Sequence, residues 1–118
     1  MTTLSLLDQS IRFDDRPASA VLRQTIKSAQ RAEDLGYHRY WVSEHHASRF
    51  LCGSAPEVLL AAIGAATRRI RIGSGGVMLP HYSAFKVAET FSMLSNLYPG
   101  RVDLGVGRAT GGEREGAA

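Results

Sequence analysis

The amino-acid sequence predicts an α/β fold in which parallel strands alternate with helices. Short apolar runs alternate along the chain with longer segments whose apolar residues recur at helical spacing, and glycine or proline stands at segment ends. Helices of this length connect neighbouring strands that run in the same direction. We therefore expect right-handed crossovers and a parallel sheet.

The first half of the chain predicts two strands joined by a helix. Residues 3–8 (TLSLLD) form a short apolar strand, and residues 17–35 carry apolar side chains at helical spacing. Gly36 follows at the position where a glycine in left-handed conformation commonly ends a helix. Residues 39–42 (RYWV) are then expected as the second strand.

The second half predicts two further strands and two helices. Ser54 and Glu57 are spaced as in a capping box, so we expect a helix to begin there and to run through residues 57–69. Residues 70–79 (IRIGSGGVML) predict the third strand, and residues 101–107 (RVDLGVG) predict the fourth. The helix between them is indicated by Val87, Phe91, Leu94 and Leu97 and is ended by Pro99 and Gly100.

Length and composition exclude several classes of protein. A chain of 118 residues makes one domain, expected over residues 1–109, and the glycine-rich tail at 110–118 is expected to be flexible. The net charge of +3 comes from scattered basic residues without adjacent stacking aromatics, so we expect no nucleic-acid partner. No apolar run approaches the ~20 residues of a membrane span, and the first residues lack a signal-peptide pattern. Cys52 is the only cysteine, which agrees with a reducing, cytoplasmic location.

The four expected strands end in residues of the types that bind ligands or take part in catalysis. Ligands of parallel α/β folds bind beyond the carboxyl ends of the strands, whether the sheet is open or closed into a barrel. We therefore expect a site at this edge, and solvated charge at the opposite edge. The residues at the carboxyl ends are Asp8, Glu44, His45, His46, Gly75, Gly76, Gly107 and Arg108, and the arginines at the opposite edge are Arg68, Arg69, Arg71 and Arg101.

The histidine pair admits more than one interpretation. His45 and His46 are consistent with two solvated residues that end a strand. Neighbours on a strand point to opposite sides, so Glu44 and His46 would face one way and His45 the other. A metal site needs three or four ligands. Because His38 and His81 are expected in other loops, we predict no metal centre.

Glycines in the second half of the chain indicate which kind of ligand to expect. In residues 105–111 (GVGRATG), Thr110 takes the place of the third glycine of a dinucleotide fingerprint, so a Rossmann interpretation is not favoured. In the third strand, Gly73, Gly75 and Gly76 weaken a strand unless something approaches its backbone closely. Three glycines within four positions favour a flat ligand that lies against bare main chain.

Four segments, each of which contains one expected strand and its carboxyl end, occur in a specific order. They are SLLDQS (5–10), GYHRYWVSEHH (36–46), RIRIGSGGVMLP (69–80) and YPGRVDLGVGRA (98–109). In this order and at these spacings, they resemble the bacterial luciferase-like, flavin-dependent monooxygenase family. The resemblance covers about residues 4–109, which is nearly the whole chain.

The resemblance implies a (β/α)8 TIM barrel that binds reduced FMN, or in some branches a deazaflavin, at the carboxyl ends of its strands. It also implies an oxidoreductase that uses O2 on a small organic substrate. His45 matches the family's active-site histidine, and Arg108 matches the arginine that reaches the flavin phosphate. The bond between Gly75 and Gly76 matches a non-proline cis peptide under the flavin ring. The residues expected to support this site are Asp8, Glu44 and His46.

The chain length departs from the family pattern. A full barrel takes about 250 residues, so 118 residues are expected to form its N-terminal half, as in a truncated or split protein. Such a chain would act as an enzyme in a homodimer or with a complementary half, and the alternative is a catalytically silent half-barrel. The helix at 57–69 is apolar nearly all round, which favours burial against a partner. The small residues expected at that contact are Ala62, Gly64 and Ala66.

Overall fold

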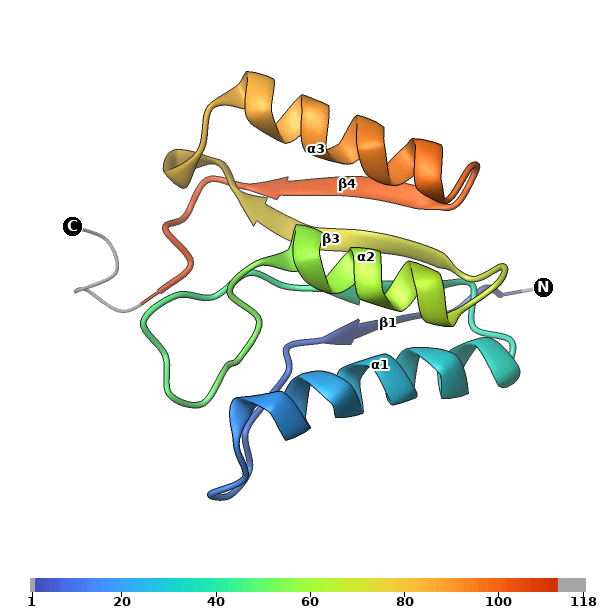
Figure 1. Cartoon of the computed structure of the whole chain (residues 1–118), viewed down its shortest axis with the longest axis horizontal. Coiled ribbons are helices and arrows are strands. Elements are labelled where there is room, and N and C mark those ends of the chain that lie inside the picture. The colour runs from blue at the N-terminus through green and yellow to red at the C-terminus, as the bar shows by residue number, and fades with distance from the viewer. Residues whose placement is uncertain (1, 113–118) are drawn as a thin grey trace.

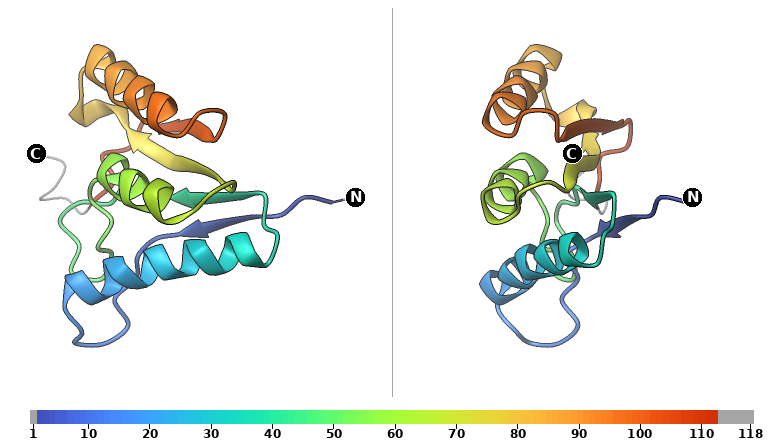
Figure 2. Two further views of the ribbon diagram at one scale, coloured as in Figure 1. Left: turned by 45° about the vertical axis from the view of Figure 1, so that its right-hand side comes forward. Right: turned by 90° about the vertical axis from the view of Figure 1, so that its right-hand side faces the viewer.

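The computed structural model describes residues 2–112 and confirms the predicted α/β architecture. The strands β1 (Ser5–Asp8), β2 (Arg39–Val42), β3 (Arg71–Met78) and β4 (Val102–Gly107) form one parallel sheet in the order β1-β2-β3-β4 (Figure 1). Successive strands are connected by α1 (Ala18–Asp34), α2 (Pro56–Ala66) and α3 (Ala84–Leu97), and the 3₁₀ helix η1 (Leu79–His81) precedes α3. The three α-helices lie on the same face of the sheet (Figure 2).

The core lies between the sheet and the three helices. Alternate strand residues point toward the helices, and Tyr40, Val42 and Ile72 are 2% exposed or less. They pack with buried helix side chains that include Ala29, Leu60, Ile63, Phe91 and Leu94. The opposite face of the sheet remains outside this core. None of the helices within residues 2–112 is long and apolar enough to cross a bilayer.

The start of α2 differs from the prediction. The helix begins at Pro56, and its N-cap residue Ala55 makes no side-chain capping bond, so the capping box predicted from Ser54 and Glu57 is wrong. Proline has no N–H to satisfy and its fixed φ suits the first helical turn, which is why this helix begins without a side-chain cap. A side-chain cap occurs instead on α3, where Ser83 Oγ accepts a backbone N–H at 3.0 Å.

Two glycines have separate structural roles in the helical layer. Gly36 has a φ of 86° directly after α1, as predicted for a residue that ends this helix. Gly64 lies against Tyr98, and a Cβ at Gly64 would lie 2.6 Å or less from three atoms of that ring. The Tyr98 hydroxyl donates to Ala61 O at 2.7 Å, which joins α2 to the segment after α3. The expectation that Gly64 faces a partner chain is therefore wrong.

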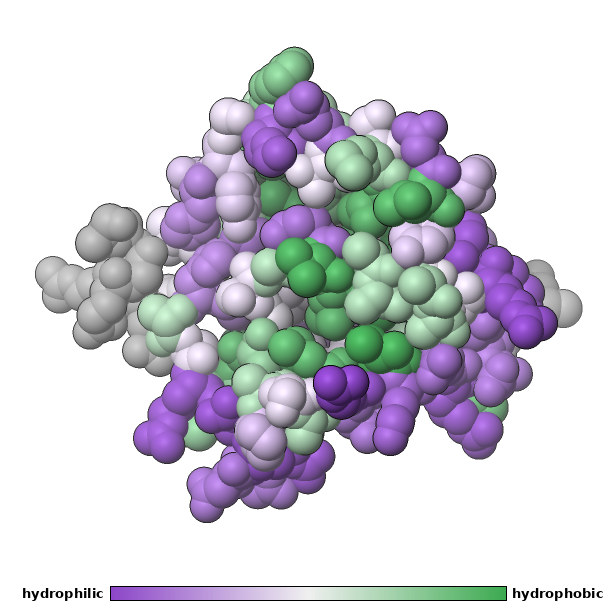
Figure 3. Space-filling view, viewed as in Figure 1, coloured by the Kyte–Doolittle hydropathy of each residue, from purple (hydrophilic) through white to green (hydrophobic). Residues whose placement is uncertain are grey.

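The outer surface of α2 is apolar nevertheless. Val58 is 68% exposed, and Ala62 and Ala65 are also exposed. Figure 3 shows hydrophobic residues gathered on the helical face of the molecule. The sequence prediction of an apolar outer side of this helix is therefore confirmed for these three positions.

Two of the four arginines at the amino edge of the sheet have bonded side chains, so the prediction of solvated charge is wrong for Arg71 and Arg101. Arg101 Nη2 donates to Thr67 Oγ1 at 2.6 Å, and its Nε donates to a backbone carbonyl at 2.9 Å. Nearby, the Glu33 carboxylate accepts three backbone N–H groups from the turn before β3. Burial acts to raise the pKa of Glu33, but these N–H groups hold it below its ordinary value.

The face of the sheet without helices carries a cluster of three charges. Arg39 Nε lies 2.7 Å from Asp103 Oδ2, and Arg71 Nη2 lies 2.7 Å from Asp103 Oδ1. The Arg39 guanidinium carbon also lies 5.0 Å from the centroid of the Trp41 ring. The hydrogen bond from Arg71 lowers the pKa of Asp103 against the opposing effect of burial, and Arg39 adds to this lowering.

We predict that Asp103→Asn destabilises the fold. Loss of the charge weakens hydrogen bonds from two arginines, so the free energy of unfolding should fall by about 2 kcal/mol at pH 7. Because the pKa of Asp103 is depressed in the folded state, its stabilisation is present above the unfolded pKa and is lost as the pH falls below about 4. Urea unfolding followed by circular dichroism at several pH values measures both effects.

Asp14→Asn is the matched control for this prediction. Asp14 pairs with Arg16 at 2.9 Å, but both side chains are largely exposed to water. Water weakens such a pair, so this substitution should leave the unfolding curve nearly unchanged. Equal effects of the two substitutions would contradict a specific role for the Asp103 cluster.

Candidate functional site

The side chains that follow β2 point alternately to opposite sides, as the sequence predicts for Glu44 and His46 against His45. Ser43 and Glu44 are both buried, and they lead into His45 and His46, which are half-buried. His45 Nδ1 lies 3.1 Å from Ser43 Oγ, whereas His46 Nε2 is hydrogen-bonded to Glu44 Oε2. The histidine pair is therefore divided between two environments, and His45 is free of the contacts that hold His46.

Glu44 is the most buried acid of the site, with 1% of its surface exposed. Its Oε1 accepts the Met78 backbone N–H at 3.1 Å, and its Oε2 accepts the Tyr82 hydroxyl at 2.7 Å as well as His46 Nε2–H. An ionised carboxylate can accept all three donors, and the protonated acid cannot do so equally well. Burial and the bond to Glu44 raise the pKa of Tyr82, so Tyr82 remains a phenol at neutral pH.

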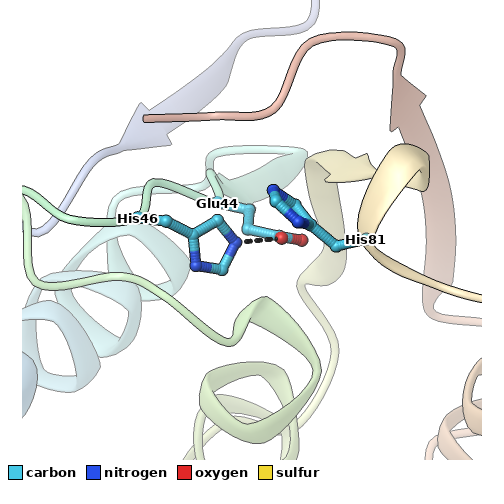
Figure 4. Close-up of side chains that lie close together, drawn as sticks. All are labelled: Glu44, His46 and His81. Atoms are coloured by element: carbon cyan, nitrogen blue, oxygen red, sulfur yellow. Dashed lines mark hydrogen bonds and ion pairs between the residues drawn. The ribbon is translucent and has the colours of Figure 1, made fainter. Parts of the chain in front are cut away.

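His81 joins this group, although the sequence placed it in a separate loop. Figure 4 shows the His46 and His81 rings beside the Glu44 carboxylate, and the two ring centroids are 4.7 Å apart. One donor atom from each of Glu44, His46 and His81 lies within 4.8 Å of the others. The expectation that His81 stands apart is wrong. The three side chains are also hydrogen-bonded within the described chain, so a metal ion there would have to displace existing bonds.

Residues 110–112, at the start of the expected tail, are bonded to the same group. His81 Nε2–H donates to Thr110 O, and the His46 backbone N–H donates to Gly111 O at 2.8 Å. His46 also forms a parallel bridge with Gly112. The remaining tail, residues 113–118, lies outside the described residues, so its expected flexibility stays a prediction.

The three glycines of β3 have three different environments. A Cβ at Gly73 would lie 2.6 Å from the Trp41 ring, and a Cβ at Gly76 would lie 2.9 Å from the backbone carbon of Val106. At Gly75, the nearest atoms would be 3.4 Å away, at ordinary contact distance, and this residue is exposed. The prediction of three bare positions is therefore wrong for Gly73 and Gly76, and Gly75 alone leaves open main chain.

The Gly75–Gly76 peptide bond is cis, as the resemblance implies. It coincides with a register irregularity between β3 and β4, where the pairing shifts between Ser74 and Val77. Ser74 Oγ donates to Gly105 O at 2.9 Å and accepts its N–H at 3.1 Å, so a side chain joins the strands where regular pairing fails. Whether a flavin lies against this bond remains a prediction.

The other two predicted site residues lie at the same edge but differ in their bonding. Arg108 directly follows β4 and is exposed, and its side chain makes no hydrogen bond or ion pair within residues 2–112. Asp8 ends β1 but points to the helical side, where its Oδ2 accepts the Tyr40 hydroxyl and its Oδ1 accepts the Ser10 N–H at 2.7 Å. Asp8 therefore orders the loop after β1 and lies away from the Glu44 group.

A small two-stranded ribbon beside His45 was not foreseen from the sequence. Cys52 N–H donates to Ser10 O at 2.9 Å, and Ile11 forms an antiparallel bridge with Leu51. The ribbon joins the site because the His45 N–H donates to Gly53 O at 2.9 Å. Its two halves come from separate loops without any periodic pattern, so no local signal indicated their pairing.

The chain matches known proteins in both sequence and fold. The sequence profile of the luciferase-like monooxygenases matches residues 3–117. The chain belongs to the luciferase-like monooxygenase family. Its parallel strands and alternating helices correspond to the N-terminal portion of the barrel of this family.

Individual relatives of the luciferase-like family support the assignment. The chain is 58% identical, over 112 residues and 95% of its length, to N-acetyl-S-alkylcysteine monooxygenase of Bacillus subtilis. It superimposes on apo-MsnO8 with a TM-score of 0.89, 48% identity and 92% coverage. The oxygenating constituent of 3,6-diketocamphane monooxygenase from Pseudomonas putida, a type II Baeyer–Villiger monooxygenase solved in complex with FMN, gives a TM-score of 0.87 at 28% identity and 92% coverage.

The chain spans only about a third of the length of these luciferase-like relatives. It covers 34% of the Bacillus subtilis enzyme, 33% of MsnO8 and 30% of the Pseudomonas putida protein.

We predict unequal stability effects for substitutions at two neighbouring glycines. Gly76→Ala should lower the free energy of unfolding by about 1 to 3 kcal/mol, because its Cβ would press on the backbone of β4. Gly75→Ala should change stability by less than about 1 kcal/mol, because its Cβ would make only ordinary contacts. Urea unfolding of both variants measures the difference, and equal destabilisation would contradict the distinction.

Proposed function

We propose that this chain binds a reduced flavin and takes part in the monooxygenation of a small organic molecule by O2. One observation carries the proposal: the exposed main chain at Gly75 lies at the edge where β2 leads into His45 and β4 leads into Arg108. Membership of the luciferase-like family and the FMN bound by the Pseudomonas putida relative support this assignment.

The residues at this edge fit the chemistry of a flavin. A flat ring system needs a surface without side chains, and Gly75 offers such a surface while its neighbours in β3 are covered by Trp41 and by β4. A phosphate needs a cation, and Arg108 is exposed and not bonded within the described chain. We propose FMN as the cofactor, with a deazaflavin as the alternative that binding measurements would distinguish.

His45 is the residue that we assign to proton transfer. Ser43 Oγ holds Nδ1 at 3.1 Å, which leaves Nε2 without a hydrogen bond among the residues described. Imidazole exchanges protons near neutral pH, so a ring oriented in this way can hold or accept a proton beside a bound ligand. When bound, the reduced flavin supplies the electrons that activate O2. The proposed supporting residues are Glu44 and His46.

The substrate that we propose for the first assays is a thioether. This choice rests on the relative at 58% identity that is named for oxidation of N-acetyl-S-alkylcysteine. A catalytically silent half-barrel is the second candidate function. The observation that favours it is the exposure of apolar residues on β4, where Leu104 is 45% and Val106 is 55% exposed.

We predict that the isolated chain binds FMN weakly, with a dissociation constant in the micromolar range or above. An exposed ion pair contributes about 0 to 1 kcal/mol, so Arg108→Ala should weaken FMN binding by at most about fivefold and leave riboflavin binding unchanged. Gly75→Ala should weaken binding of both flavins, because its methyl group would stand where the ring is proposed to lie. Flavin fluorescence titration measures all these affinities.

Three results would contradict the proposal. Sub-micromolar binding of FMN by a monomer would show that Arg108 and Gly75 are not the main contacts. An unchanged affinity of Gly75→Ala for both flavins would place the ring elsewhere. Tighter binding of a deazaflavin than of FMN would replace the proposed cofactor by its alternative.

We further propose that the chain self-associates or pairs with a complementary half-barrel. Exposed apolar residues on β4 and on the outer side of α2 favour this, as do the outer edges of β1 and β4, whose backbone groups can pair with another strand. Light scattering after size exclusion should detect a dimer at micromolar concentration. Ala62→Glu should weaken a dimer that forms through α2, and a stable monomer of the unmodified chain would refute self-association.

A further inference from the structure

We infer that His46 and His81 are positioning residues which hold the segment after β4, and with it Arg108, at a fixed place beside the flavin site. We call the contact of these two histidines with residues 110–112 the histidine latch. The inference rests on the proposed flavin function, because Arg108 is the residue proposed to meet the phosphate.

One side of the histidine latch is formed by the backbone of His46. Its N–H donates to Gly111 O at 2.8 Å, and it forms a bridge with Gly112. Gly111 has a φ of 76°, and a Cβ there would lie 2.7 Å from Met78 Cγ and 3.0 Å from Glu44 O. Glycine is therefore the residue that fits at this contact, and the segment passes close to the backbone of the site.

The other side of the latch is formed by the ring of His81. Its Nε2 is bonded to Thr110 O, and a carbonyl only accepts, so the Nε2 atom carries the proton. The His46 ring packs edge-on against the His81 ring and donates to the buried Glu44 carboxylate (Figure 4). The imidazole of His81 thus connects the segment after β4 to the most buried charge at this edge.

The latch acts on Arg108 through the backbone. Gly107, just before Arg108, pairs with Met78 in the sheet, and Gly111, three residues after it, is held by His46. The chain is therefore fixed on both sides of an arginine whose own side chain has no hydrogen-bond partner in the described part of the protein. A fixed backbone reduces the ordering needed when a ligand phosphate binds, so the latch should favour phosphate binding without touching the flavin ring.

The first test compares FMN with riboflavin, which lacks the phosphate. His81→Ala should weaken FMN binding by about twofold to fivefold, within the limit set by one exposed ion pair, and leave riboflavin binding unchanged. His81→Gln should restore FMN binding, because its amide N–H can donate to Thr110 O. His38→Ala, which removes an exposed histidine at the opposite edge of the sheet, is the matched control and should change neither affinity.

A double variant tests whether the latch works through Arg108. His81→Ala combined with Arg108→Ala should bind FMN no more weakly than Arg108→Ala alone, since the two changes affect one interaction. Additive losses in the double variant, or equal losses for FMN and riboflavin in His81→Ala, would overturn the inference.

The second test does not depend on flavin. Hydrogen exchange at the His46 amide, which donates to Gly111 O, should be faster in His81→Ala than in the unmodified chain and should return to normal in His81→Gln. If the unmodified chain binds neither FMN nor riboflavin, the proposed function fails while this exchange experiment still decides whether the latch exists. Unchanged exchange in His81→Ala would overturn the latch.

Discussion

A carboxylate that is almost fully removed from water organises the carboxyl edge of this sheet. A buried charge is very costly unless hydrogen-bond donors surround it, so the chain has to bring donors to Glu44. These donors come from the end of β3, from the segment before α3 and from the loop after β2, through Met78, Tyr82 and His46. Satisfying one charge therefore fixes the three segments that surround the candidate site.

At the same edge, the glycines of β3 leave space beside the backbone because they carry no side chain. Most of the space left by glycine is used by the chain itself, because Trp41 fills the side of Gly73 and the backbone of β4 fills the side of Gly76. The main chain at Gly75 stays open. In β3 the glycines therefore serve first for close packing, and open main chain is confined to Gly75.

Charge is divided between the two faces of the sheet. Asp8 and Glu44 bond with groups on the helical side or within the loops, while Asp103 pairs with Arg39 and Arg71 on the face that lacks helices. Each acid has partners within the described chain, so the geometry of this portion of the luciferase-like fold is maintained by its own contacts. Among the predicted site residues, His45 Nε2 and the Arg108 guanidinium have no hydrogen-bond partner within residues 2–112.

The sequence by itself determined the parallel strands, the helices between them, the common edge at which the predicted site residues lie and the opposite orientation of His45 and His46. These features follow from local periodicity and from the alternation of side chains along a strand, which depend on neighbouring residues. The tertiary structure decided that α2 begins at Pro56 without the predicted cap, that Tyr98 occupies the space at Gly64, and that His81 and Tyr82 join Glu44. The contacts of Tyr98 with Gly64 and of Tyr82 with Glu44 join residues more than thirty positions apart. Their partners are selected by packing and by the need to satisfy a buried charge, which no local pattern records.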